Sequence, residues 1–450
     1  MSTESYFVRF LLLIYCFLGS MFLVVFSSNL VRLLVGWDLL GFTSFFLVSF
    51  FGNRRSFAAA LCTSVTNRLG DCFFFVLLGL SLQGGLHLSA IVTALLYLIS
   101  MTKSAILPFS AWLPAAIYAP TPVSALVHSS TLVTAGIYLL FRFSVLPSQI
   151  LVSLGILTSL LGGLAGSLEN DSKKIIAFST LSQLGLIITG LGLGLRNCTF
   201  NHILSHAIIK ATLFLAVGVV IHSQYGSQEL RSCSALSYAS PATFVTLAIS
   251  YLGLRGITFT SGYFTKDKLL EAGFCNTWSL VPLVLFYLSI GLTVSYLLLL
   301  GLRILGLVST TAGSWTMVAV GTNLKAPMLV LVCYILYQAQ AFRVNGGLRF
   351  SILTFSDKCV IYFFLAVGCL IGYIFRFYRG RFISPFEWVS ISNTFSGSVI
   401  VPLGSVLHCE VKTVIVFGVG SFFKMLNQIT WARLISPIGV LCLFLIMCTV

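Results

Sequence analysis

The sequence predicts an all-α, polytopic membrane protein. The chain has 450 residues, of which 58% are hydrophobic and 8% are charged, and its mean hydropathy is +1.03. Soluble proteins carry roughly 25% charged residues, so this composition excludes a soluble domain. Because one membrane-spanning helix needs about 20 mainly apolar residues, we expect nearly the whole chain to be embedded, as a transmembrane helical bundle of about 13 spans with two interrupted helices.

The first two spans are predicted near residues 7–27 and 29–51, separated by a short polar turn. The second contains the run GWDLLG, which places Asp38 well inside an apolar helix. Ionisable groups inside the membrane are rare and mark functional sites by default. Asp38 is therefore a candidate site residue.

A third span follows Arg54-Arg55 and carries the run NRLGD near its start. Arg68 and Asp71 are three residues apart in this run, so they lie on one helix face and can pair. Two interpretations remain open: a charge-neutral anchor near the membrane interface, or a functional pair.

The first interrupted helix is predicted between residues 101 and 142. Prolines fall close together there, at positions 108, 114, 120 and 122. Each proline removes a backbone donor and clashes with the preceding turn, which argues against one continuous helix. Lys103 comes just before this break, at the end of a fourth span that begins near His87, and His128 follows it in a fifth span.

Broken backbone inside a membrane protein is tolerated only where it is buried in protein or lines a wet cavity. A lysine and a histidine beside such a break therefore suggest an ion path. The alternatives are that Lys103 extends to the interface along its own stem, and that His128 is a core histidine bonded to a carbonyl.

A basic stripe is predicted on the eighth span, at about residues 200–223. His202, His206 and Lys210 follow one another at steps of four, which advance by about 40° beyond a full helical turn. H-x-x-x-H spacing can bind zinc, but the metalloprotease motif needs a glutamate after its first histidine, where this chain has Ile203. With no third ligand evident, we expect no metal site.

The ninth apolar segment extends from Pro241 to about Ala272, too long for one straight span. It contains several glycines and then Lys266 and Asp267. We interpret it as the second interrupted helix, with this charged pair beside the break. The alternative is that residues 266–268 form a solvated loop.

Further spans are predicted near 278–302, 322–341, 357–377 and 434–450, with a lateral amphipathic helix over 404–431 lying along the membrane or protein surface. We accordingly divide the chain into residues 1–307 as the translocation core, 308–403 as further transmembrane helices, and 404–450 as the lateral helix with a terminal anchor.

The formal net charge is +15, from 26 basic and 11 acidic residues. The basic runs flank hydrophobic segments, as at Arg54-Arg55 and Lys173-Lys174, which the positive-inside rule explains. Nucleic-acid binding needs a basic patch on a folded surface, and none is evident, so we expect no nucleic-acid partner. The twelve cysteines include no C-x-x-C pair, which disfavours a redox or metal framework.

Six stretches carry a family resemblance, in this order along the chain: GWDLLG, NRLGD, the region 102–142, DSKKIIAFSTLSQLG, HILSHAIIKATLFLAVGVVIH and GYFTKDKLLEAG. The chain resembles the antiporter-like membrane subunits of NADH:ubiquinone oxidoreductase (respiratory complex I). The form PTPVSALVH favours the subunit 5 branch over its paralogues. The specific resemblance covers about residues 5–300.

The resemblance implies an antiporter-like inverted-repeat fold that starts at the family's fourth helix. The first three helices would then be absent or supplied by a separate chain. It also implies a proton relay through the middle of the membrane, formed by Asp38, Asp71, Lys103, His128, His202, His206, Lys210, Lys266 and Asp267.

Asp38 stands where the family normally has a glutamate paired with the lysine that matches Lys103. Burial disfavours a charged ammonium and a nearby carboxylate favours it. A change in the distance between Asp38 and Lys103 is therefore expected to switch the proton affinity of the lysine.

The function implied is proton translocation coupled to electron transfer from NADH to ubiquinone in other subunits. No cofactor is then expected in this chain, since FMN and iron–sulfur clusters would lie in partner subunits. The expected partners are other complex I membrane subunits, above all the neighbouring antiporter-like subunit, and phospholipids. The start of the chain, without a signal or transit pattern, fits a multi-pass protein encoded in the organelle and placed in the mitochondrial inner membrane.

Two alternatives remain. A subunit of a multisubunit sodium/proton antiporter has nearly the same motifs, and a structural complex I subunit that has lost pumping would tolerate the change at Asp38. The retained lysines at 103, 210 and 266 argue against the second alternative.

Overall fold

The computed structural model describes residues 6–82, 90–143, 147–223, 226, 228–229, 241–256, 260–275, 280–304, 327–335, 337 and 355–377. They all belong to one compact unit, Met1–Phe382, which is distinct from Ile383–Val450. Within the described ranges the regular secondary structure is helical, apart from one isolated antiparallel bridge between Asp171 and Glu229. The predicted all-α class is confirmed.

Three long helices open the chain, as predicted: α1 (Phe7–Phe26), α2 (Leu30–Val48) and α3 (Arg54–Leu82). Each packs against the next. One expectation was wrong, because the NRLGD run lies midway along the 29 residues of α3 rather than near its start. The Arg68–Asp71 pair therefore lies near the middle of this helix.

The predicted break after Lys103 is confirmed. Short helical pieces replace a continuous helix: α4 (Ala90–Lys103), α5 (Trp112–Ala115), the 3₁₀-helix η1 (Ala116–Tyr118), α6 (Thr121–Val123), the π-helix η2 (Ser124–Thr131) and α7 (Leu132–Arg142). The indole Nε1 of Trp112 donates to the carbonyl of Thr102 at 3.0 Å. This bond ties the segment after the break back to the end of α4.

The centre of the packing is α9 (Ser172–Gly192), whose apolar window is wholly buried. It lies against α8 (Gln149–Leu168) and α10 (Arg196–Ser223). Glycines allow the close approach of α8 and α9, since a Cβ at Gly185 would come within 2.7 Å of the Gly155 carbonyl oxygen. Small residues at such contacts are typical of helices packed in membranes.

The second predicted break is also confirmed. Helix α12 (Pro241–Arg255) ends beside Gly256, whose φ is +78°, and α13 (Ser261–Cys275) begins after it. Two long helices complete the described elements, α14 (Leu280–Ile304) and α17 (Phe355–Phe377), as expected for 278–302 and 357–377. Of the span predicted at 322–341, the described residues are helical.

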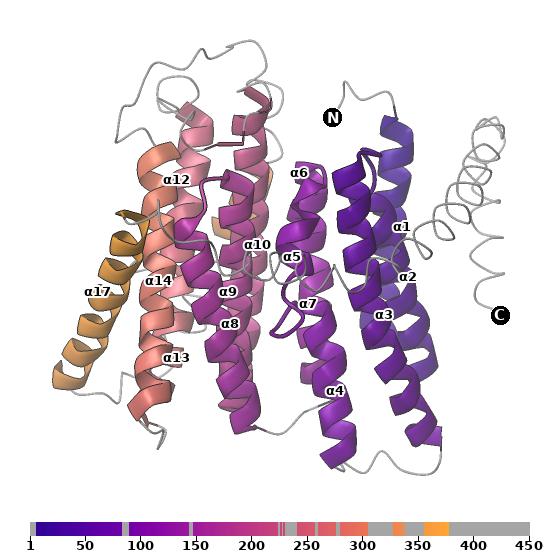
Figure 1. Cartoon of the computed structure of the whole chain (residues 1–450), viewed down its shortest axis with the longest axis horizontal. Helices are drawn as coiled ribbons and strands as arrows, with labels where there is room; N and C mark the ends of the chain where they lie inside the picture. The colour runs from indigo at the N-terminus through magenta and orange to yellow at the C-terminus, as the bar shows by residue number, and fades with distance from the viewer. Residues whose placement is uncertain are drawn as a thin grey trace, which may run out of the picture. The chain divides into compact units, whose positions relative to one another are not determined.

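Helices in contact form a series from α1–α3 through α4, α7, η2, α10, α9 and α8 to α14 and α17 (Figure 1). Seven helices of the described ranges are long and apolar enough to cross a membrane, so the chain is a multi-pass membrane protein. The lateral helix over 404–431 and the span at 434–450 lie outside the described residues. The predicted division at residues 307 and 403 stays a prediction.

Candidate functional site

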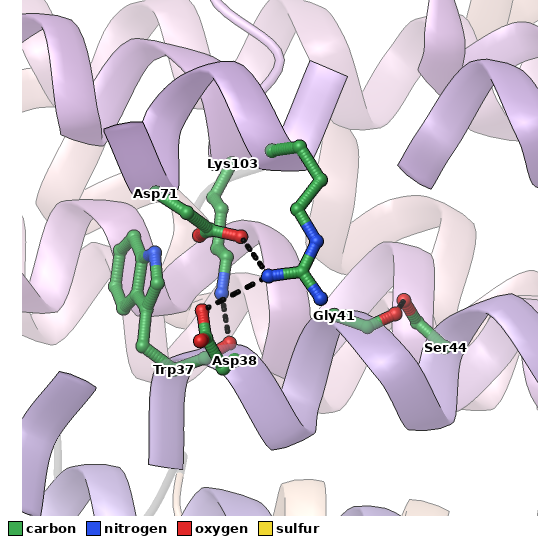
Figure 2. A network of polar contacts seen from close by, with 7 residues as sticks. Trp37, Asp38, Gly41, Ser44, Asp71 and Lys103 are labelled. Carbon is green, nitrogen blue, oxygen red and sulfur yellow. Dashed lines mark hydrogen bonds and ion pairs between the residues drawn. The ribbon is translucent and has the colours of Figure 1, made fainter. Parts of the chain in front are cut away.

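Four charged side chains from three helices meet midway along α3, and we call them the Asp38 cluster: Asp38 on α2, Arg68 and Asp71 on α3, and Lys103 at the end of α4. Arg68 Nη1 lies 3.3 Å from Asp71 Oδ2 and 3.6 Å from Asp38 Oδ1. One guanidinium nitrogen thus contacts both carboxylates, and Figure 2 shows the two carboxylates beside the lysine.

Lys103 is completely buried, with 0% of its surface exposed. Its Nζ donates to the Trp37 carbonyl oxygen at 2.6 Å and lies 3.9 Å from the centroid of the Trp37 ring. Figure 2 draws the bond from Lys103 to the carbonyl as a dashed line. A cation over an aromatic face gains about 2 kcal/mol when the pair is desolvated. These contacts overturn the alternative in which Lys103 extends to the membrane interface.

The electrostatic pairing of Asp38 with Lys103 that the resemblance implies is not a direct ion pair among the described residues. Among the described residues, Arg68 is the ion-pair partner of Asp38, while the ammonium of Lys103 contacts Trp37. Both carboxylates are still close enough to act electrostatically on Lys103. The physical reason is competition, because a guanidinium from the adjacent helix reaches both carboxylates at once.

His128 lies in the π-helix η2 and is buried. Its ring centroid is 6.1 Å from that of Trp112. Neither ring nitrogen has a well-formed hydrogen bond among the described residues, although the Ala116 backbone is close enough to act on it. Single turns of π-helix are frequent at functional sites, and here the turn presents a titratable group beside the proline-rich break.

The predicted basic stripe is buried along α10. His202, His206 and Lys210 are each at most 2% exposed, which shows that the stripe faces protein rather than lipid. The ring centroids of the two histidines are 6.5 Å apart. Lys210 Nζ donates to the Ile176 carbonyl at 3.2 Å and to the Ser179 hydroxyl, both on α9.

The imidazole of His202 joins three helices. Its Nδ1 is hydrogen-bonded to Thr265 Oγ1 of α13 at 2.9 Å, and its Nε2 to Gln183 Oε1 of α9 at 3.2 Å. Lys266 follows Thr265 and is 5% exposed, with its Nζ bonded to the Leu254 carbonyl at 2.7 Å. The alternative of a solvated loop at 266–268 is therefore wrong.

Asp267 is half-buried on α13 and close enough to act electrostatically on Tyr263 of the same helix. Its neighbour Lys266 instead reaches across the second break to the end of α12. Successive residues on a helix point in directions about 100° apart, so the two members of this predicted pair have different surroundings.

Buried polar atoms without a hydrogen-bond partner occur in the Asp38 cluster, at the basic stripe of α10 and in the region between them. In the described part of the chain they belong to Trp37, Asp38, Asn67, Asp71, Ser104, His128, Gln183 and His206. Buried polar groups are nearly always bonded to protein or to ordered water. Each of these atoms therefore needs water or another polar group as its partner.

Sequence reasoning missed several residues that contact the predicted ones, namely Trp37, Ser179, Gln183 and Thr265. Two of them had a usable signal, since Ser179 and Gln183 are four apart and share a face of α9. Trp37 and Thr265 precede predicted site residues, but adjacency along a helix does not indicate contact. Within the ranges described, no group of three His, Cys, Asp or Glu residues is placed to hold a metal ion.

Known proteins share both sequence and fold with this chain. Residues 27–293 match the sequence profile of the family described as NADH:quinone oxidoreductase/Mrp antiporter, transmembrane. NADH-ubiquinone oxidoreductase chain 5 of Aedes aegypti is 42% identical over 306 residues, which are 64% of this chain and 53% of the relative. The chain therefore spans about half the length of this curated relative.

A second relative, chain 5 of Anopheles gambiae, is 38% identical over 394 residues, covering 81% of this chain and 67% of the relative. Among solved structures, a chain of the Mrp complex from Dietzia sp. superposes with a TM-score of 0.70 at 22% identity, covering 88% of this chain and 48% of that chain. A chain of an archaeal membrane-bound sulfane sulfur reductase gives a TM-score of 0.64 at 20% identity, covering 79% and 77%.

Proposed function

The chain belongs to the NADH:quinone oxidoreductase/Mrp antiporter transmembrane family, and from that premise we propose that it is a proton-translocating membrane subunit of NADH:ubiquinone oxidoreductase. The relatives at about 40% identity are named as chain 5 of that enzyme. In this proposal the chain contributes to the translocase as a subunit, and electron transfer from NADH to ubiquinone takes place in other subunits.

The observation that carries the proposal is the burial of ionisable groups at the two interrupted helices and on α10. Lys103 and Lys210 are fully buried and Lys266 nearly so, each with its ammonium bonded to a backbone carbonyl. Burying an ion costs several kcal/mol after relaxation, so such groups are retained mainly where they carry protons or ions.

In the proposed relay, each proton held on a buried amine or imidazole passes through water to the next group. Asp38 and Asp71 supply negative charge at the Lys103 end. His128 lies beyond the break, and His206 is within electrostatic range of Lys210, His202 and Lys266. Histidine exchanges protons near neutral pH, so His128, His202 and His206 are assigned the intermediate steps, with Lys266 and Asp267 at the exit side.

The finer architecture and surroundings are part of the same proposal. The complete fold would have about 13 spans, with a lateral helix over 404–431. The protein would lie in the mitochondrial inner membrane. Its partners would be the neighbouring antiporter-like subunit and phospholipids, and FMN and iron–sulfur clusters would be held in other subunits.

A sodium/proton antiporter subunit is the second candidate, supported by the fold shared with a chain of the Mrp complex. Identity distinguishes the two, since it is 22% to that chain and 42% to the oxidoreductase chain from Aedes aegypti. The proteins that co-purify with this chain distinguish the oxidoreductase subunit from the antiporter subunit. Partners bearing flavin and iron–sulfur clusters support the oxidoreductase, and a complex lacking them supports the antiporter.

Lys103→Met tests the relay in assembled complexes. Methionine fills a similar volume without a titratable group, so we expect the protons pumped per NADH oxidised to fall severalfold. The matched control is Lys174→Met, because Lys174 is partly exposed and pairs with Asp171 at 3.0 Å at the start of α9. Unchanged pumping per electron in an assembled Lys103→Met complex would show that the relay role is wrong and would favour a structural subunit.

A further inference from the structure

The tryptophan that precedes Asp38 contacts the Lys103 ammonium in two ways. Its carbonyl oxygen accepts a hydrogen bond from Nζ at 2.6 Å, and its ring centroid lies 3.9 Å from the same nitrogen. The side chains of Trp37 and Lys103 are both 0% exposed. The ammonium is therefore held against a π face and a carbonyl dipole in a site from which bulk water is excluded.

These contacts give Lys103 a neutral partner although two carboxylates are near. In the part of the chain that the structure describes, Arg68 is the ion-pair partner of both Asp38 and Asp71. A direct ion pair in a low-dielectric interior is strongly attractive and would hold a proton on the lysine. Contacts with a neutral residue keep the ammonium next to the carboxylates without a direct ion pair, which would bind the proton more strongly.

The aromatic ring is also sensitive to the protonation state. Its attraction for a cation arises from the ring quadrupole, which has no comparable attraction for a neutral amine. The contact therefore acts on the protonated form of Lys103 and is lost when the proton leaves. Trp37 is for this reason more than a packing residue.

We propose that Trp37 is a positioning residue, which holds protonated Lys103 beside the Asp38 and Asp71 carboxylates and keeps its proton transferable. This inference rests on the proton-translocating function proposed above. It assigns the tryptophan a role in the relay that acts through Lys103 and not by exchange of its own protons.

The test compares two substitutions of Trp37 with a packing control in assembled complexes. Trp37→Phe keeps a smaller π face, and Trp37→Leu removes it while the carbonyl stays in place. Phe74→Leu is the control, because Phe74 is fully buried and its ring centroid is 5.8 Å from that of Trp37, yet its removal leaves the π face over Lys103. The readout is protons pumped per NADH oxidised, with assembly measured alongside.

We expect Trp37→Leu to lower this ratio about fivefold and Trp37→Phe about twofold, following the loss of cation–π attraction, with Phe74→Leu near the wild-type ratio. The inference is overturned if neither Trp37 substitution lowers the ratio more than Phe74→Leu does. Should Trp37→Leu fail to assemble, Trp37→Phe against Phe74→Leu decides, and equal ratios overturn the inference. Lys103→Met separates the two proposals, since a normal ratio there rejects the function itself.

Discussion

The imidazole of His202 lies between two side chains from other helices. Thr265 of α13 bonds to Nδ1 and Gln183 of α9 bonds to Nε2. Both ring nitrogens are thus occupied, which fixes the plane of the ring. His206, one turn further along α10, has neither nitrogen bonded among the described residues. The two histidines therefore differ in how their rings are held. The ring of His202 is fixed by two hydrogen bonds, whereas the ring nitrogens of His206 are available to bind water.

Thr265→Val removes the hydroxyl that holds His202 while it keeps the shape of the side chain. A buried nitrogen that loses its partner costs about 1–3 kcal/mol, so the ring loses its fixed orientation. We expect proton pumping per NADH oxidised to fall by roughly fivefold or more, since about 1.4 kcal/mol corresponds to a tenfold change and the lower end of that range to about fivefold. The ratio in assembled complexes is the measurement.

Thr212→Val is the matched control for this substitution. Thr212 is equally buried on α10, but its hydroxyl donates to the Ile209 carbonyl of its own helix at 2.6 Å. Thr265→Ser, which keeps the hydroxyl, is expected to restore pumping. If Thr212→Val lowers pumping as far as Thr265→Val does, the bond to His202 has no special importance.

At the scale of elements, the placement of α9 depends on how closely α8 approaches it. A Cβ on Gly185 would lie 2.6 Å from the Ser159 backbone nitrogen and 2.7 Å from the Gly155 carbonyl oxygen. Because these are backbone atoms, the two helices must separate to admit it. Helix α9 carries Ser179 and Gln183, so this separation would shift the partners of Lys210 and His202.

Gly185→Ala is accordingly expected to destabilise the bundle by about 1–3 kcal/mol, the usual cost of overpacking. A lower temperature of complex dissociation, followed on native gels after heating, is the measurement. Gly79→Ala is the control, because a Cβ at Gly79 of α3 meets nothing within 4 Å. Equal stability of the two variants would show that the contact between α8 and α9 is not limiting.

At the scale of the whole molecule, hydrogen bonds between helix ends and segments far apart in the chain place these segments at shared ends of the bundle. The Ser172 amide donates to the Gln228 carbonyl at 3.0 Å, and Lys173 Nζ donates to the Ala119 carbonyl at 3.4 Å. Arg142 Nη1 bonds to the Val24 carbonyl at 3.3 Å. The first two contacts join segments that alternating spans put on one side, and the third joins segments on the other.

This alternation predicts the accessibility of introduced cysteines. Asn53→Cys and Gln228→Cys are expected to react with an impermeant maleimide from one side of sealed membranes, and Ser28→Cys and Asn197→Cys from the other. The parent chain, with its native cysteines, is the control for background labelling. Reaction of Ser28→Cys and Asn53→Cys from the same side would contradict a membrane-spanning α2.

Much of the fold was predictable because the bilayer restricts the possibilities. Apolar runs of spanning length predicted the ends of α1, α2, α10 and α14 to within about four residues, and prolines and glycines located both breaks. The position of NRLGD within α3 was predicted wrongly, because an arginine and an aspartate in an apolar run suggest a membrane interface when their partners are unknown. In the structure Arg68 contacts both Asp38 and Asp71, so these charges compensate one another at mid-helix.

The sequence by itself determined that this is a helical membrane protein with two broken helices, and it showed which ionisable residues lie inside the apolar segments. Both follow from local composition, since every span must satisfy its own backbone. Only the tertiary structure decided which groups meet: Arg68 on Asp38 and Asp71, Trp37 on Lys103, and Thr265 with Gln183 on His202. Those pairings depend on distances between helices that are far apart in the chain, and these are set by packing.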